Sequence, residues 1–184
     1  PTLREHNTCI IVKDGWAGRT PELSQVIAEA DFDEIGMFES RLDDYNGVRW
    51  DRSVIWPKSR YFFVVDDLRA NEPGQYAFQN IWRTLGNARL EGGRWISVMG
   101  DTAFNLIACS DASLSQKQSA GTSLNAKPFP INQARALIEA GGGEMGRGDS
   151  YQFANLFYTG PNAPNERRVH AWQIGDSTTW AIDD

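Results

Sequence analysis

Apolar and polar residues alternate along residues 48–56, and this alternation is the strongest structural signal in the chain. Successive side chains of a β-strand point to opposite faces of a sheet. The segment therefore places Val48, Trp50, Arg52, Val54 and Trp56 on one face. We predict a strand with an apolar stripe that is interrupted by a single arginine.

Two more strand-like runs follow at short spacing. Residues 61–65 are apolar on both faces, and residues 76–82 place Tyr76, Phe78, Asn80 and Trp82 on one face. Polar turns join the three runs, which predicts an antiparallel meander. Similar runs at 8–12, 95–99, 103–109, 151–158, 169–174 and 178–182 extend the pattern. We therefore predict a mainly β fold, a large two-sheet antiparallel β-sandwich.

Two segments carry helix signals within this β pattern. Thr20-Pro21 precedes apolar residues at helical spacing from 23 to 30, which favours a helix. Because the surrounding pattern is β, residues 22–43 read as helix or as strand. Residues 110–129 are polar and read as a long loop. After Pro130, Ala134, Leu137 and Ile138 share a helical face, and three glycines from Gly141 would end the helix in a mobile connection. One or two short helices are therefore expected beside the sandwich.

Composition fits one globular domain. The chain has 184 residues, 41% of them hydrophobic and 23% charged, and no apolar run reaches the roughly 20 residues that a spanning helix needs. A net charge of −6 argues against nucleic acid as a partner. The sequence begins at Pro1 without an initiator methionine, and its first residues do not have the pattern of a signal sequence. Residues 1–184 therefore read as a fragment of a longer protein. Cys9 and Cys109 are either buried thiols or one disulfide.

The motifs of self-contained catalytic centres are absent from the sequence. There is no G-x-S-x-G, H-E-x-x-H or C-x-x-C, and the only histidines are His6 and His170. His6, just before the first strand, is the candidate metal ligand or acid/base group, and His170 reads as a structural or solvent-edge residue. We assign no catalytic residue to this chain.

Two side chains are candidates for contact with a sugar. Arg52 needs a partner on its apolar stripe, and an ion pair with Asp66 or Asp67 is the first interpretation; binding of a sugar carboxylate is the second. Most of the seven tryptophans lie on strand faces and read as core. Trp16, in a Gly-Trp-Ala-Gly loop, is expected outside, where an indole would stack on a sugar ring.

Three segments together resemble heparinase II/III-like polysaccharide lyases. They are His6-Asn7-Thr8 followed by Asp14-Gly15, Tyr45-Asn46-Gly47-Val48 leading into Arg52-Ser53-Val54, and the strand from Tyr61 to Asp66. Their order and spacing carry the resemblance, which covers about residues 5–85 well.

The resemblance implies an architecture and an activity. Members of the family carry an N-terminal α/α toroid followed by a large antiparallel sandwich, so this chain would be the sandwich and the toroid its partner. The sandwich also favours strand over helix for residues 22–43. The implied reaction is β-elimination of an acidic, uronic-acid-containing polysaccharide by a periplasmic or secreted enzyme. The tyrosine and asparagine implicated in the reaction lie in the toroid, so this chain alone would be inactive.

The resemblance also implies a metal. Some members bind zinc in the sandwich through two histidines and an aspartate, and His6 resembles one of these ligands, with the others outside this chain. The sequence departs from the family at Ile81-Trp82-Arg83, where many relatives carry a histidine, so the identity of the polysaccharide is open. A non-catalytic carbohydrate-binding module and a scaffold sandwich are the alternative interpretations.

Overall fold

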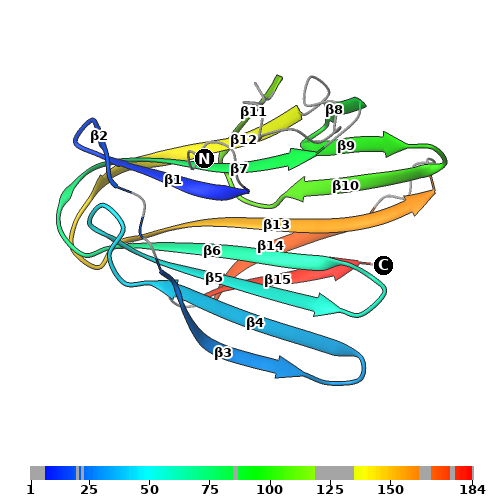
Figure 1. The fold of residues 1–184 in the computed structure, drawn as a ribbon, viewed down its shortest axis with the longest axis horizontal. Helices are drawn as coiled ribbons and strands as arrows, with labels where there is room; N and C mark the ends of the chain where they lie inside the picture. The colour runs from blue at the N-terminus through cyan, green and yellow to red at the C-terminus, as the bar shows by residue number, and fades with distance from the viewer. Residues whose placement is uncertain are drawn as a thin grey trace, which may run out of the picture.

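The protein is a layered β structure without helices among the residues that can be described (Figure 1). The computed structural model describes residues 7–19, 21, 23–84, 87–118, 135–161, 167–174 and 177–183. These ranges contain no helix able to cross a bilayer. They form fifteen strands: β1 (Thr8–Lys13), β2 (Trp16–Ala17), β3 (Gln25–Asp31), β4 (Ile35–Leu42), β5 (Val48–Pro57), β6 (Phe62–Ala70), β7 (Gly74–Thr84), β8 (Asn87–Glu91), β9 (Arg94–Met99), β10 (Thr102–Ala108), β11 (Ser113–Gln118), β12 (Arg135–Met145), β13 (Ser150–Pro161), β14 (Arg168–Ile174) and β15 (Ser177–Asp183).

The strands build two antiparallel sheets that face each other. One sheet has the order β11-β12-β7-β1-β2, and the other has the order β3-β4-β5-β6-β13-β10-β9-β8. The predicted sandwich is therefore confirmed. The predicted meander is split between the layers, because β5 and β6 pair in the eight-stranded sheet whereas β7 crosses to the five-stranded sheet. We call the faces that the two sheets turn toward each other the inner faces.

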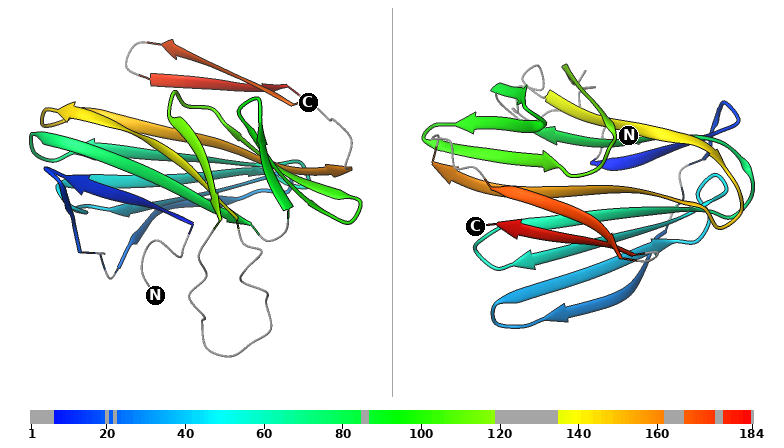
Figure 2. Two further views of the ribbon diagram at one scale, coloured as in Figure 1. Left: turned by 90° about the horizontal axis from the view of Figure 1, so that it is seen from above. Right: turned by 180° about the vertical axis from the view of Figure 1, so that it is seen from behind.

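A third layer covers the opposite side of the eight-stranded sheet. Strands β14 and β15 form a separate hairpin, and Figure 2 shows it as a layer of its own. Val169, Trp180 and Ile182 of this hairpin pack on an apolar cluster that includes Phe63 and Leu156. The ring centroids of Phe63 and Trp180 lie 5.4 Å apart in an edge-on arrangement. Both faces of the central strands are thus buried, which explains why residues 61–65 are apolar throughout.

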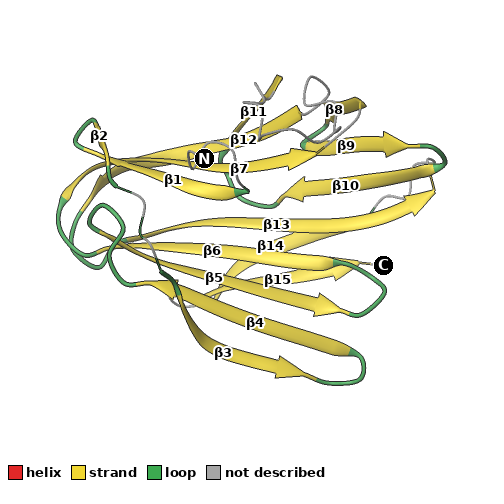
Figure 3. Ribbon diagram, viewed as in Figure 1, coloured by secondary structure: helices red, strands yellow, loops and turns green. Residues whose placement is uncertain are grey.

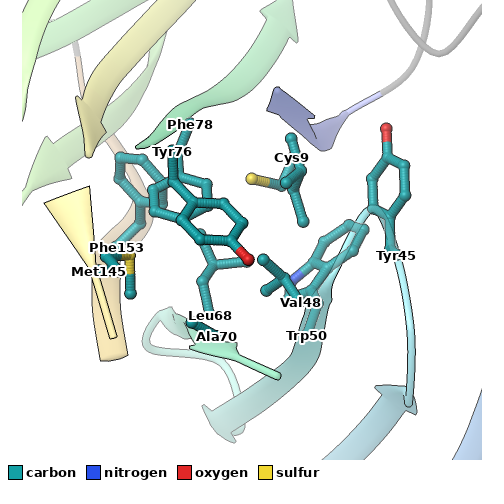
Figure 4. Packing of buried hydrophobic residues seen from close by; sticks show 11 residues of the cluster. Cys9, Tyr45, Val48, Trp50, Leu68, Ala70, Tyr76, Phe78, Met145 and Phe153 are labelled. Carbon is teal, nitrogen blue, oxygen red and sulfur yellow. The ribbon is translucent and has the colours of Figure 1, made fainter. Parts of the chain in front are cut away.

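The core between the two sheets is aromatic. Burial of each large apolar side chain contributes roughly 1.5–3 kcal/mol relative to exposure. One cluster joins residues of β1, β7 and β12 to residues of β5, β6 and β13 (Figure 4); its buried members are Cys9, Ile11, Tyr45, Val48, Trp50, Leu68, Ala70, Tyr76, Phe78, Met145 and Phe153. The core role expected of the strand-face tryptophans is confirmed for Trp50, Trp82 and Trp95. Trp56 is partly exposed.

The helix predicted after Pro130 is wrong over residues 135–145. These residues form β12, which pairs with β7 on one side and with β11 on the other (Figure 3). Leu137 and Glu139 face inward, while Ala136 and Ile138 pack on the outer face with Ile81. Two neighbouring strands thus satisfy the backbone and override the helical spacing. The predicted loop at 110–129 is also partly wrong, because residues 113–118 form β11; residues 119–129 lie outside the described ranges.

The glycines at 141–143 belong to the same strand and do not form the predicted connection. A Cβ on Gly141 would lie 1.8 Å from the Tyr151 hydroxyl oxygen, and one on Gly142 would lie 2.3 Å from the Tyr76 carbonyl oxygen. Gly142 also has a φ of +125°, which residues with a side chain rarely adopt. The glycines therefore allow close approach of neighbouring groups.

Residues 25–42 form β3 and β4, so strand is correct there and helix is wrong. A hairpin turn at Asn46-Gly47 joins β4 and β5, and both residues have positive φ, as this dipeptide favours. The cysteines are free thiols, which excludes the disulfide alternative in this structure.

Candidate functional site

A largely buried ion pair lies on the inner face of the eight-stranded sheet. Arg52 on β5 stands opposite Asp66 on β6; its Nε donates to Asp66 Oδ1 at 2.6 Å and its Nη2 to Oδ2 at 2.9 Å. The indole Nε1 of Trp50 donates to Oδ1 at 2.7 Å, and Nδ2 of Asn80 donates to Oδ2 at 3.1 Å. The predicted ion pair is confirmed with Asp66, because Asp67 points to the opposite face of the strand.

Aromatic rings enclose the arginine. Its guanidinium carbon lies 5.1 Å from the ring centroid of Trp50 and 5.0 Å from that of Trp82. The remaining Nη1 donates to the carbonyl oxygen of Asn7 at 3.3 Å. Burial disfavours the charge of Arg52, but the carboxylate of Asp66 outweighs this and raises the pKa of Arg52 above its ordinary value. The guanidinium is therefore a permanent, paired cation.

A cavity of about 260 Å³ lies beside this arginine. Arg52, Trp50 and Tyr45 form part of its wall, and Ser24 and Ser40 add hydroxyl groups. The cavity holds polar donors and aromatic surface together, which is the kind of lining that binds small polar ligands.

A second carboxyl group lies between the sheets, and no cation of the described part of the chain pairs with it. Glu139 on β12 is fully buried, and the indole Nε1 of Trp82 donates to its Oε1 at 2.8 Å. Burial raises the pKa of Glu139 to about 7, and the negative charge of Asp66 acts in the same direction. The hydrogen bond from Trp82 and the nearby side chains of Asn155 and Ser110 oppose the shift.

Sequence reasoning missed this second carboxyl group. Glu139 fell within the predicted helix, where a lone glutamate reads as a surface residue. The available signal was Asn80, a polar residue on the apolar face of its strand. A buried amide needs a polar partner, and Glu139 stands directly opposite Asn80 in the β7–β12 pairing.

Trp16 lies where the sequence predicted an exposed indole. It occupies β2 at the edge of the five-stranded sheet, with 80% of its surface exposed. The amide of Asn46 donates to the carbonyl oxygens of Ile11 and Trp16 and so fixes the backbone that carries the indole. The structure does not bring Trp16 and Arg52 into contact.

No metal centre is visible in the part of the chain that can be described. That part contains no group of three or more histidine, cysteine, aspartate or glutamate side chains able to hold a metal ion. His6 lies outside the described residues, so its predicted metal role stays a prediction. His170 lies on the outer hairpin, exposed, with its Nε2 3.2 Å from Asp183 Oδ2, in agreement with the expected solvent-edge position.

The inner face of the eight-stranded sheet continues beyond its five-stranded partner. Strands β3 and β4 extend away from β1 and β7 in Figure 1. Val26 and Phe38 lie on these two strands, and Trp56 and Phe62 lie at the adjoining ends of β5 and β6. All four side chains are more than a third exposed. Trp56 and Phe62 have ring centroids 5.9 Å apart. We call these four residues the open inner face. Together they form an apolar patch, which single exposed apolar residues scattered over a surface would not form.

Comparison with known proteins gives a match in structure but not in sequence. No protein-family model matches the sequence, and no curated protein matches it. A solved structure titled heparinase III, BT4657 gene product, superposes with a TM-score of 0.74 at 12% identity, covering 98% of this chain and 30% of that one. Heparan sulfate lyase HepC from Pedobacter heparinus gives 0.74 at 13% identity, covering 97% and 29%. A further heparinase III structure gives 0.68 at 7% identity, covering 98% and 29%.

The match extends over nearly the whole chain, whereas the chain spans less than a third of the length of these enzymes. The resemblance inferred from His6-Asn7-Thr8 and the later segments is therefore confirmed for the fold. This chain has the fold of one domain of heparinase III and heparan sulfate lyase HepC.

Proposed function

We propose that this chain is the β-sandwich domain of a polysaccharide lyase that cleaves a uronic-acid-containing polymer by β-elimination. The observation that carries the proposal is the superposition on heparinase III over 98% of the chain. The lyase motifs in residues 6–66 support it independently of the structure. The domain is catalytically incomplete alone, because an acid/base pair for proton removal and leaving-group protonation is not assembled on its surface among the described residues.

The open inner face is the surface on which the rest of such an enzyme would pack. The enzymes that share this fold are about three times longer than this chain. Phe38, Trp56 and Phe62 form an apolar surface whose burial would stabilise contact with a helical neighbouring domain at roughly 25 cal/mol per Å². The cavity beside Arg52 lies along the same inner face and would open into the cleft between the domains.

Arg52 has an indirect role in this proposal. Asp66 already accepts two of its N–H groups, so a substrate carboxylate would have to displace a buried partner to bind it in a bidentate manner. The pair instead holds Trp50 and the cavity wall in place. The hydroxyl groups of Ser24 and Ser40 remain as donors to a sugar in the cavity.

The direct test uses the longer protein that contains this domain. It is mixed with alginate, heparan sulfate, chondroitin and hyaluronan, and ultraviolet absorbance reports unsaturated sugar ends. We expect one polymer to give product and the 184-residue chain alone to give none. Failure of every polymer to yield unsaturated ends would overturn the lyase assignment.

A carbohydrate-binding role without catalysis is the second candidate, and the exposed indole of Trp16 favours it. In this case the isolated chain would bind a polysaccharide, and Trp16→Ala would abolish binding without changing thermal stability. Tryptophan fluorescence titration with the same four polymers distinguishes this role, since a lyase domain of the first kind requires its neighbour for tight binding.

Two further parts of the proposal follow from the family resemblance. Zinc would be held by His6 together with ligands outside this chain, and His6→Ala in the longer protein would then reduce bound zinc in a metal assay. Unchanged zinc content would remove His6 from the ligand set. We also propose a periplasmic or secreted location, where such polymers occur, which cell fractionation of the longer protein would test.

A further inference from the structure

Between the two sheets, Asp66 and Glu139 are the fully buried carboxyl groups among the described residues, and Arg52 is the cation beside them. Arg52 uses Nε and Nη2 on Asp66, so their charges cancel within the pair. Glu139 is fully buried nearby, and the indole Nε1 of Trp82 donates a hydrogen bond to its Oε1. An ionised Glu139 would therefore leave one net negative charge in the core, which is strongly disfavoured without a partner.

Among the described residues, the charged and titratable groups that face Glu139 supply no second cation. From β6 it faces Asp66, a like charge, and from β5 it faces Arg52, which is already paired. The remaining neighbours are the thiols of Cys9 and Cys109 and the phenol of Tyr151, whose pKa values burial raises, so they stay neutral. Charge balance among the described residues thus favours the neutral carboxylic acid.

The hydrogen-bonding inventory shows what a proton on Glu139 would contact. Oε2 of Glu139 and the Oδ1 atoms of Asn80 and Asn155 are buried acceptors that complete no hydrogen bond among the described residues; Nδ2 of Asn155 and Oγ of Ser110 are buried donors in the same condition. Asn80 stands opposite Glu139 in the sheet, and Asn155 faces it from β13 of the other sheet. An ionised Oε2 could accept from Asn155 or Ser110 but would keep an unpaired charge between the sheets, whereas a protonated Oε2 becomes a donor for one of the asparagine oxygens and leaves no charge.

We propose that Glu139 holds a proton in the folded protein and that this proton joins the two sheets through the buried asparagines, which makes the sandwich interior a proton-binding site. Loss of the proton places an unpaired charge between the layers and loosens their packing. The site stands apart from the lyase assignment, since it uses no substrate and no neighbouring domain.

The test is a titration of the 184-residue chain by nuclear magnetic resonance between pH 4 and 8.5. The side-chain carboxyl carbon of Glu139, assigned through bonds to its own backbone amide, reports its protonation. We expect a midpoint near 7. The indole N–H resonance of Trp82 should shift with the same midpoint, because it donates to this carboxyl group.

Two variants sharpen the result. Glu139→Gln keeps the shape without a titrating proton and should abolish the Trp82 shift. Glu144→Gln removes an exposed carboxyl group from the same strand and should leave the shift intact. A Glu139 midpoint at or below about 5, close to that of a free glutamate, would overturn the proposal. Because the carboxyl carbon is observed in the unaltered protein, this conclusion holds even if Glu139→Gln fails to fold.

Discussion

Gly142 and Gly143 are adjacent in β12, but their surroundings differ. We expect Gly142→Ala to destabilise the fold by on the order of 3 kcal/mol, because its φ is +125° and the new Cβ would meet the carbonyl oxygen of Tyr76. Gly143→Ala is the matched control, since nothing lies within 4 Å of a Cβ there. Urea unfolding measures both free energies, and equal effects would contradict this account.

The pair of Arg52 and Asp66 makes a second prediction at the residue scale. Asp66→Ala leaves the guanidinium buried without its partner and should cost about 3–5 kcal/mol. Arg52→Leu leaves the carboxylate of Asp66 buried without its cation in the same way. The double variant should lose less stability than the sum of the single variants, because the pair is removed together. Strict additivity in a double-mutant cycle would show that the two side chains are not coupled.

Glu139 should make the stability of the protein depend on pH. Its pKa is raised from an ordinary 4.5 to about 7, so the folded state binds more protons than the unfolded state between these values. The free energy of unfolding should therefore fall by about 3 kcal/mol as pH rises from 4.5 to 7. Chemical unfolding at a series of pH values checks this. Glu139→Gln should lack this part of the pH dependence, and an identical slope in both proteins would contradict it.

At the scale of elements, strands in which apolar and polar side chains alternate are predicted from the sequence more reliably than strands that are buried on both faces. Residues 48–56 were assigned correctly because one face is apolar and the other is polar. Strand β12 was missed because residues 136–138 are apolar on both faces, a pattern that a short helix also produces. Its identity depends on β7 and β11, which flank it in space but are distant in sequence.

The hairpin of β14 and β15 is the element that we expect to open first. It pairs with neither large sheet and is held mainly by apolar contacts such as that between Phe63 and Trp180. Trp180→Ala should cost about 1–3 kcal/mol and accelerate amide hydrogen exchange in the hairpin more than in β6. Thr179→Ala alters the opposite face and serves as control. Unchanged exchange after Trp180→Ala would contradict this role.

At the scale of the whole molecule, the open inner face should make the isolated chain self-associate. Phe38→Glu and Phe62→Glu place charge on this face and should raise the dissociation constant about tenfold or more, which corresponds to about 1.4 kcal/mol. Met99→Glu changes an exposed apolar residue elsewhere and is the control. Sedimentation at several concentrations measures the effect. A wild-type chain that stays monomeric throughout would contradict the prediction.

The fold and the site differ in how far the sequence predicted them. The sandwich, the pair of Arg52 and Asp66 and the exposed Trp16 follow from local patterns, because alternation and a charge on an apolar stripe are visible in a single segment. The grouping of Asn80, Glu139 and Asn155 depends on β7, β12 and β13 meeting in space. The periodicity of a single segment does not show which distant strands become its neighbours in the fold.

The pairing of strands distant in sequence has a consequence for how the chain acquires its structure. Strand β13 separates β6 from β10, and β12 completes the other sheet beside β7. On a ribosome, the five-stranded layer cannot close until the polypeptide has emerged past residue 145, and the eight-stranded layer cannot close until it has emerged past residue 161. Topologies of this kind fold slowly because distant segments must find each other first. Newly synthesised chains should therefore spend a long period with unpaired edges, during which assistance from chaperones would raise the yield.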